Sequence, residues 1–185
     1  MLAQPLLSVH NFTLEYKTRK GYVSAVNDVS FDLLPGQAMG LVGESGCGKT
    51  TIAMALLRLS PDNAVIRQGQ ILLDGQDLLT MSDQQMRDVR WARISMVFQA
   101  AMNALDPVYR VGDQIIEALN RHKNDLSLEQ KRQWVAELFK LVGIDTKMIS
   151  RYPHEFSGGM RQRAVIAMAL ACNPSLIIAD EPTTA

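Results

Sequence analysis

The chain has 185 residues, of which 47% are hydrophobic and 21% charged, and its 19 basic residues balance its 19 acidic residues. This composition excludes a wholly disordered chain, a collagen-like repeat, a small disulfide scaffold and a strongly basic nucleic-acid binder. The longest run without a formal charge, residues 164–179, is shorter than the roughly 20 apolar residues of a membrane-spanning helix. Two isolated cysteines, Cys47 and Cys172, have no metal-ligand spacing, so we expect a reduced, cytosolic protein.

The first 35 residues alternate apolar and polar side chains in the manner of antiparallel strands. A polar turn that ends in glycine, residues 17–21, interrupts the alternation and predicts a hairpin. A second turn at residues 35–36 leads into an apolar segment, residues 38–42, which we expect to form a buried strand. A further strand is expected at residues 69–74.

A glycine-rich sequence follows the segment 38–42 and matches the pattern G-x4-G-K-[ST] of a phosphate-binding loop, or P-loop. In this pattern backbone N–H groups surround a polyphosphate, Lys49 contacts the β- and γ-phosphates, and the Thr50 hydroxyl binds Mg²⁺. The motif lies between an expected strand and an expected helix, and a chance match is about one in a hundred. The sequence therefore predicts these ATP-binding residues: Gly43, Glu44, Ser45, Gly46, Cys47, Gly48, Lys49, Thr50 and Thr51.

The middle of the chain is helical in pattern. Ser82 and Gln85 have the spacing of a capping box, which predicts that a short helix begins after Ser82. Ser127 and Gln130 have the same spacing before an amphipathic run. Gly143 is placed to end that second helix as the residue after its C-cap.

Two apolar runs are expected to be strands that end in polar side chains. Residues 94–98 lead to Gln99, and residues 176–179 lead to Asp180 and Glu181. A carboxylate at the end of a strand can hold Mg²⁺, and a second one can deprotonate an attacking water. An acidic pair in this position is more often the start of a solvated loop, but the P-loop upstream favours the catalytic interpretation.

Ser157 is expected to begin another helix, and the two glycines after it leave the helix N-terminus open to an anion. Taken together, the motifs resemble the ATP-binding subunit of ATP-binding-cassette (ABC) transporters. Residues 43–50 resemble Walker A, Gln99 resembles the Q-loop glutamine, and residues 180–181 resemble Walker B with its catalytic base. The family signature is matched by Ser157, Gly158, Gly159 and Met160.

Within this family, the segments 25–31 and 152–163 are similar to the dipeptide/oligopeptide/nickel importers. Residues 99–107 keep the framework of that subfamily's Q-loop and depart from it at several positions. The resemblance covers essentially the whole chain, and its motifs are specific.

The resemblance implies an α/β fold, namely a P-loop NTPase core with an N-terminal antiparallel β subdomain and an inserted helical subdomain. It assigns residues 1–100 to the β subdomain and P-loop core, residues 101–160 to the helical subdomain, and residues 161–185 to the return through Walker B. Family members continue beyond Ala185 into further core elements. We therefore expect a partial ABC ATP-binding domain, incomplete at its C-terminus, that is poorly stable alone and does not turn over ATP by itself.

ATP and Mg²⁺ are the cofactors that the resemblance implies, with Thr50, Gln99 and Asp180 at the metal and Lys49 and Glu181 as catalytic residues. Two cassettes, identical or paralogous, would pair head-to-tail, and the signature helix of each would face the ATP held by the other. The other expected partners are transmembrane permease subunits and, indirectly, an extracytoplasmic solute-binding protein; no nucleic acid is expected. The chain would be peripheral on the cytoplasmic face of the inner membrane and would power the import of peptides or a related solute such as nickel.

Two other functions fit part of the sequence. A soluble ABC-type ATPase acting on nucleic acid or ribosomes would share the motifs, but the coiled-coil insertions, zinc-binding cysteines and basic tails of such proteins do not occur in this sequence. A small nucleotide kinase would account for the P-loop and leave residues 157–163 unexplained. For the adenine, Tyr16 is the expected stacking residue because it ends the first strand, and Tyr22 across the hairpin is the alternative.

Three further features have a structural interpretation. Cys47 is interpreted as a small spacer in the P-loop, and His154 as a structural or surface histidine without metal partners. Arg87, Arg90 and Arg93 are interpreted as a solvated helix face.

Overall fold

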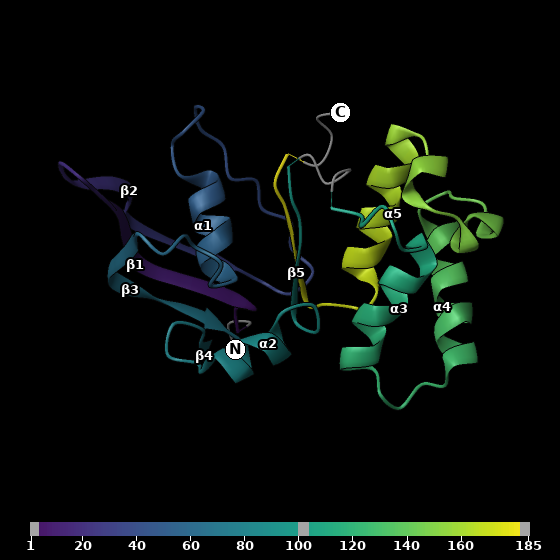
Figure 1. The fold of residues 1–185 in the computed structure, drawn as a ribbon. Helices are drawn as coiled ribbons and strands as arrows, with labels where there is room; N and C mark the ends of the chain where they lie inside the picture. Colours follow the sequence, from purple (N-terminus) through teal and green to yellow (C-terminus); the bar gives the residue numbers. More distant parts are fainter. Residues whose placement is uncertain (1–3, 100–103, 182–185) are drawn as a thin grey trace. The chain divides into compact units, whose positions relative to one another are not determined.

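The computed structural model describes residues 4–99 and 104–181, and the chain divides into two compact units (Figure 1). We call Met1–Arg87 the P-loop unit and Asp88–Ala185 the helical unit. The boundary falls in the last turn of helix α2 (Asp83–Val89). This division follows packing, whereas the division into residues 1–100, 101–160 and 161–185 follows motifs and stays a prediction.

A four-stranded antiparallel sheet forms most of the P-loop unit, with the strand order β2-β1-β3-β4. Its strands are β1 (Leu7–Thr18), β2 (Gly21–Leu33), β3 (Ala64–Leu73) and β4 (Gln76–Asp77). The expected hairpin is confirmed, since Thr18 pairs with Gly21 and leaves a two-residue turn between β1 and β2. β3 begins at Ala64, earlier than residue 69, because the long strand β1 offers it backbone partners as far as Tyr16.

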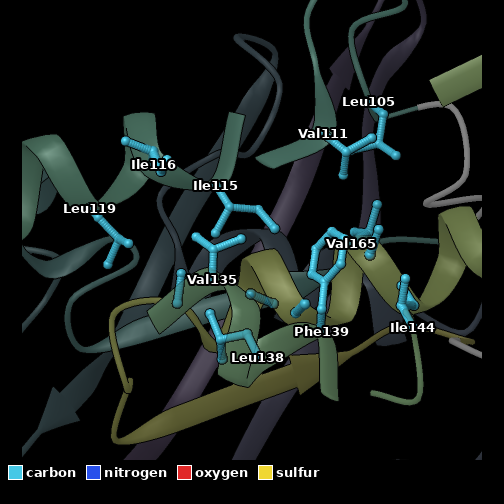
Figure 2. Packing of buried hydrophobic residues seen from close by; sticks show 14 of the residues in the cluster. Leu105, Val111, Ile115, Ile116, Leu119, Val135, Leu138, Phe139, Ile144 and Val165 are labelled. Carbon is cyan, nitrogen blue, oxygen red and sulfur yellow. The ribbon is translucent and has the colours of Figure 1, made fainter. Parts of the chain in front are cut away.

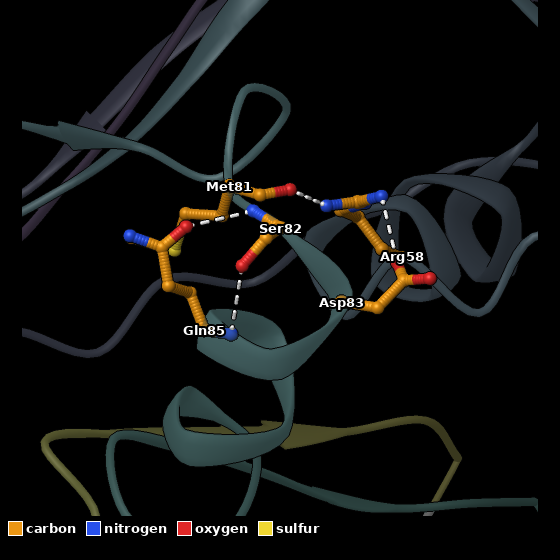
Figure 3. A network of polar contacts seen from close by, with 5 residues as sticks. All are labelled: Arg58, Met81, Ser82, Asp83 and Gln85. Carbon is orange, nitrogen blue, oxygen red and sulfur yellow. Dashed lines mark hydrogen bonds and ion pairs between the residues drawn. The ribbon is translucent and has the colours of Figure 1, made fainter.

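Helix α1 (Lys49–Leu56) follows the P-loop, as expected. Just after it, the Arg58 guanidinium donates to the Met81 carbonyl and to the Asp83 carboxylate, 3.2 Å away (Figure 3). The Ser82–Gln85 capping box is confirmed beside these contacts, with reciprocal N–H···O bonds of 2.8 and 3.3 Å. Arg58 thereby joins the end of α1 to the start of α2.

One prediction is wrong: residues 38–42 do not form a strand. Met39, Leu41 and Val42 are exposed, and Val42 is 96% exposed. A strand needs a neighbour to pair its backbone N–H and C=O groups, and none of residues 4–99 and 104–181 pairs with this segment. Apolar side chains alone therefore do not make it a strand.

In its described residues, 88–99 and 104–181, the helical unit has the α-helices α3, α4 and α5 and a parallel pair of strands (Figure 1). The helices are α3 (Val111–His122), α4 (Leu128–Leu141) and α5 (Gly158–Leu170), with the short 3₁₀ turns η2 (Thr146–Ser150) and η3 (Pro153–Glu155) between α4 and α5. The strands are β5 (Ile94–Val97) and β6 (Leu176–Ala179), both where the sequence predicts them. No helix in the described part of the chain is long and apolar enough to cross a membrane.

One apolar core holds the helical unit together, and Figure 2 shows its side chains converging from α3, α4 and α5. Ile115 and Leu119 of α3 and Phe139 of α4 are fully buried in it. The Phe139 ring meets the Phe156 ring edge-on, with centroids 6.5 Å apart, an arrangement that suits the charge distribution of aromatic rings. Helix α4 packs through Val135, Leu138 and Phe139, which the helical repeat places on one face, whereas Leu141 is exposed.

The predicted ends of α4 are confirmed. The Ser127 hydroxyl accepts a hydrogen bond from the Gln130 backbone N–H (3.2 Å), and the Gln130 side chain accepts one from the Ser127 N–H (2.8 Å). At the other end Gly143 has φ +70°, a conformation that glycine adopts without strain.

The arginine cluster is a second correction. Arg87 lies in the last turn of α2, but the helix ends at Val89, and Arg90 and Arg93 lie beyond it in half-buried positions. Arg93 pairs its backbone carbonyl with the N–H of Leu176 at the start of β6 (3.0 Å). The three arginines therefore do not share one helix face, because the chain leaves the helix to start the parallel strand pair.

Candidate nucleotide site

The P-loop is shaped by one close approach of two backbone segments. Gly48 caps the N-terminus of α1 with φ +96°, and a Cβ atom added to it would lie 2.3 Å from the Ala25 carbonyl oxygen of β2. Only glycine combines this dihedral angle with this contact. The sheet therefore fixes the point where the loop becomes the helix.

Lys49 lies across the loop that precedes it. Its ammonium group donates to the carbonyl oxygens of Gly43 (2.9 Å) and Glu44 (2.8 Å), and the Cys47 N–H also donates to Glu44 (3.3 Å). The first turn of α1 has no capping side chain and no acidic residue. A helix N-terminus with a lysine ammonium beside it attracts an anion, so this arrangement suits the phosphates that the sequence predicts.

Tyr16 and Tyr22 lie on opposite faces of the sheet. Tyr16 pairs with Val23, while the adjacent Lys17 pairs with Tyr22, and neighbouring residues of a strand point to opposite faces. The Tyr16 hydroxyl lies 3.2 Å from the Thr51 hydroxyl of α1, so its face is the one that carries the P-loop helix.

Tyr22 contacts Arg67 on the other face of the sheet. Its ring is covered by the Arg67 guanidinium at 4.2 Å, and Arg67 also pairs with Glu15 at 2.7 Å. The hydrogen bond to Glu15 raises the pKa of Arg67 above its ordinary value. Between the two alternatives for the adenine, this geometry favours Tyr16.

The helical unit brings together a predicted metal residue, Gln99, and the predicted catalytic base, Glu181. β5 and β6 are parallel, Val97 pairs with Ala179, and the Asp180 N–H donates to the Val97 carbonyl (3.0 Å). Just beyond these strand ends, the Gln99 amide donates to the Glu181 carboxylate at 2.7 Å. Parallel strands end at the same edge of a sheet, which is why residues so distant in sequence meet here.

The donor set at this edge fits the predicted metal. Asp180 offers carboxylate oxygens and Gln99 an amide oxygen, and Mg²⁺ prefers such hard oxygen ligands. Thr50, the third predicted metal residue, follows Lys49 in the first turn of α1 in the P-loop unit. The roles of these residues stay predictions.

The signature residues form the start of α5. Ser157 is the N-cap, and its hydroxyl accepts a hydrogen bond from the Met160 N–H (3.3 Å), as the sequence predicts. The first turn holds no acidic side chain, and Gly159 is exposed with open space beside its Cα. The helix N-terminus is thus open to an anion brought by another molecule.

The short turn η3, just before the signature residues, is stabilised by a hydrogen bond and an ion pair of Glu155. Glu155 accepts from the Tyr152 N–H (2.8 Å) and pairs with Arg151 (3.0 Å), and these contacts lower the pKa of Glu155, the backbone bond most of all. His154 is exposed and stacks on the Tyr152 ring at 5.8 Å. In the described residues no group of three or more His, Cys, Asp or Glu side chains is placed to hold a metal ion.

The sequence interpretation missed the Tyr16–Thr51 contact and the Gln99–Glu181 contact. The hairpin register places Tyr16 and Tyr22 on opposite faces, but the contact of Tyr16 with Thr51 requires the packing of α1 on one of those faces. No local signal announces the second, since it requires the pairing of β5 with β6.

Comparison with known proteins supports the family resemblance. Residues 26–184 match the family described as "ABC transporter". The chain is 49% identical over 185 residues to the "Dipeptide transport ATP-binding protein DppD" of Bacillus subtilis, covering 98% of this chain and 55% of the relative. It is 46% identical over 183 residues to the "Oligopeptide transport ATP-binding protein OppD" of the same organism, covering 97% of this chain and 51% of the relative. The chain thus spans about half the length of these curated relatives.

Solved structures with a similar fold are also ATP-binding cassettes. The fold matches "Dimeric Structure of MJ0796, a Bacterial ABC Transporter Cassette" with a TM-score of 0.84 and 28% identity, over 96% of this chain and 74% of that one. A second match with the same values is the "Dimeric structure of a post-hydrolysis state of the ATP-binding cassette MJ0796 bound to ADP and Pi". Sequence profile and fold agree, and the chain belongs to the ABC transporter family.

Proposed function

We propose that this chain binds Mg-ATP and acts as the ATP-hydrolysing subunit that powers peptide import through a membrane ABC transporter. The observation that carries the ATP part is the P-loop, where Lys49 lies over the loop carbonyls at the start of α1, whose N-cap Gly48 has no side chain to satisfy the first N–H groups. The peptide part rests on relatives named for dipeptide and oligopeptide transport. A related solute such as nickel is the other substrate class within this proposal.

Each residue has a definite task in this proposal. Lys49 and the loop amides hold the phosphates, and Thr50, Gln99 and Asp180 hold Mg²⁺, which supplies charge neutralisation at the phosphates when bound. Glu181 takes a proton from the attacking water. The Gln99 amide, which donates to Glu181, orients that carboxylate.

The proposed assembly has two ATP-binding subunits. Ser157, Gly158, Gly159 and Met160 of one subunit face the γ-phosphate on the other, where amides and the helix dipole stabilise negative charge. Support comes from the solved cassettes of the same fold, which are described as dimeric. Permease subunits and, indirectly, an extracytoplasmic solute-binding protein complete the transporter at the cytoplasmic face of the inner membrane.

The first test is titration calorimetry with Mg-ATP. We expect Lys49→Ala to weaken binding at least about 50-fold, because hydrogen bonds between charged partners are the strong ones. Lys20→Ala, which removes an exposed lysine from the hairpin turn, is the control and should bind like the parent. Equal affinity for both variants would rule out the P-loop as the phosphate site.

The second test addresses catalysis and transport in the assembled transporter. We expect Glu181→Gln to retain Mg-ATP binding and to lose most of the hydrolysis rate and peptide uptake, because the amide cannot accept the proton of the water. Unchanged turnover would exclude Glu181 as the base. Uptake of nickel without uptake of di- or oligopeptides would replace the peptide assignment and leave the ATPase assignment intact.

A further inference from the structure

One hydrogen bond joins a side chain of the sheet to a side chain in the first turn of α1. The Tyr16 hydroxyl of β1 lies 3.2 Å from the Thr51 hydroxyl, and both side chains are partly buried. Thr51 is two residues after Lys49, within the predicted phosphate-binding sequence. A residue expected to contact the base is thus bonded directly to one expected to contact the phosphates.

The same hairpin also touches the loop at a second point, where Gly48 meets the Ala25 carbonyl. Ala25 is on β2, and Tyr16 is on the paired strand β1. The hairpin therefore supports the start of α1 at both Gly48 and Thr51. Two contacts from one hydrogen-bonded sheet restrict how the loop and the first helical turn can move relative to the Tyr16 ring.

The chemistry of the two hydroxyls gives the bond a direction. A phenol is a stronger hydrogen-bond donor than an aliphatic alcohol because its proton is more acidic, whereas the alcohol oxygen is the better acceptor. When Tyr16 donates to Thr51, the Thr51 proton stays available for an acceptor outside the pair. A hydroxyl that already accepts one hydrogen bond donates a second one more strongly.

We propose that the Tyr16 hydroxyl is a positioning group for the nucleotide. It orients Thr51 as a donor toward bound phosphate and fixes the Tyr16 ring on the sheet, so that the base contact and the phosphate contact are pre-organised together. This inference rests on the proposed binding of ATP. It assigns the hydroxyl a task separate from that of the ring, which a phenylalanine would keep.

Tyr22 provides a matched control on the same sheet. It lies on the opposite face, its ring is covered by Arg67, and it is 51% exposed. Tyr22→Phe removes a hydroxyl from the same hairpin without touching α1. Any effect of Tyr16→Phe that Tyr22→Phe lacks belongs to the contact with Thr51.

The experiment measures affinity by titration calorimetry for two probes, Mg-ATP and the base-free Mg-tripolyphosphate. We expect Tyr16→Phe to weaken both about two- to tenfold, the range for one neutral hydrogen bond, and Tyr22→Phe to change neither. Tyr16→Leu, which removes the ring as well, should weaken Mg-ATP further and leave tripolyphosphate at the level of Tyr16→Phe. If the hydroxyl only stabilised the fold, Tyr16→Phe would bind tripolyphosphate as tightly as the parent does.

A double-mutant cycle completes the test. Because the hydroxyl acts through Thr51, Tyr16→Phe should have no further effect in a Thr51→Val background. Parent-like affinity of Tyr16→Phe, or losses that simply multiply in the double variant, would overturn the inference while ATP binding by the parent stands. Failure of the parent chain to bind Mg-ATP would overturn the inference together with the proposed function.

Discussion

In the P-loop unit the candidate phosphate contacts come from one continuous stretch, residues 43–51, whereas in the helical unit Gln99 and Glu181 meet across 82 positions of sequence. The first arrangement is set by local backbone conformation and by the hairpin behind it. The second is set by the pairing of β5 with β6, two strands that lie far apart in the sequence and belong to the unit whose core the intervening helices form.

The two parts of the site are therefore sensitive to different kinds of substitution. A change in the core of the helical unit acts on its strand pair through the packing of the whole unit. A change in the P-loop acts at once on the atoms that would hold phosphate. Stability measurements and binding measurements should therefore respond to different substitutions.

The largest expected effect is on the stability of the helical unit. Phe139→Ala should cost about 3–5 kcal/mol in the free energy of unfolding, because the ring is fully buried and its removal leaves a cavity. Both tryptophans, Trp91 and Trp134, belong to this unit, so their fluorescence during urea unfolding follows it specifically. Leu141→Ala on the same helix is the control, since Leu141 is 72% exposed; an equal loss for both would contradict the core described above.

The second largest expected effect is on the affinity of the P-loop unit for Mg-ATP. Gly48→Ala should reduce Mg-ATP affinity at least about tenfold, since a side chain at φ +96° stores about 1–3 kcal/mol of strain and its Cβ would collide with the Ala25 carbonyl. The tryptophan unfolding midpoint should stay near that of the parent. Gly40→Ala, where the added atom meets nothing within 4 Å, is the control. A shifted tryptophan midpoint for Gly48→Ala would show that the two units do not respond separately.

A smaller effect is expected at the start of α4. Ser127→Ala should lower the stability of the helical unit by about 1 kcal/mol, because it removes the acceptor for the Gln130 N–H. The exposed Ser175, outside any helix, gives the control Ser175→Ala. Equal stability of the two variants in urea would mean that the capping box does not contribute.

The smallest effect is a dependence on pH. Burial, reinforced by Arg121, lowers the pKa of His122 below its ordinary value of 6.5. The unfolded chain then binds the proton more readily than the folded one, so the stability of the helical unit should decrease as pH falls through 6.5 toward the lowered value. In His122→Gln this loss of stability at falling pH should disappear when unfolding in urea is measured at several pH values. An unchanged dependence of stability on pH would mean that other groups cause it.

Local signals predicted much of the fold correctly. The hairpin, the capping boxes at Ser82 and Ser127, the N-cap Ser157 and the glycine after α4 were all readable because each depends on residues close in sequence. The order of the motifs predicted the family as well.

The errors and omissions have a common physical cause. Residues 38–42 are apolar enough for a strand, but strand formation depends on a partner that their own sequence does not specify. Arg90 and Arg93 continue the basic pattern of Arg87, yet the chain turns out of the helix before them to pair with β6. The Gln99–Glu181 bond likewise depends on a neighbour far along the chain.

The separation of Gln99 from Glu181 also bears on how freely the intervening segment can vary in length. Their contact closes a long loop, and the entropy of closing a flexible loop grows only with the logarithm of its length, by about 0.6 kcal/mol for each doubling. The connection between α4 and α5 packs on α3, where the Val111 N–H donates to the Arg151 carbonyl (2.9 Å), whereas Asn124 and Asp125 between α3 and α4 are exposed. The connection between α3 and α4 is thus a place where insertions should leave the geometry of Gln99 and Glu181 unchanged.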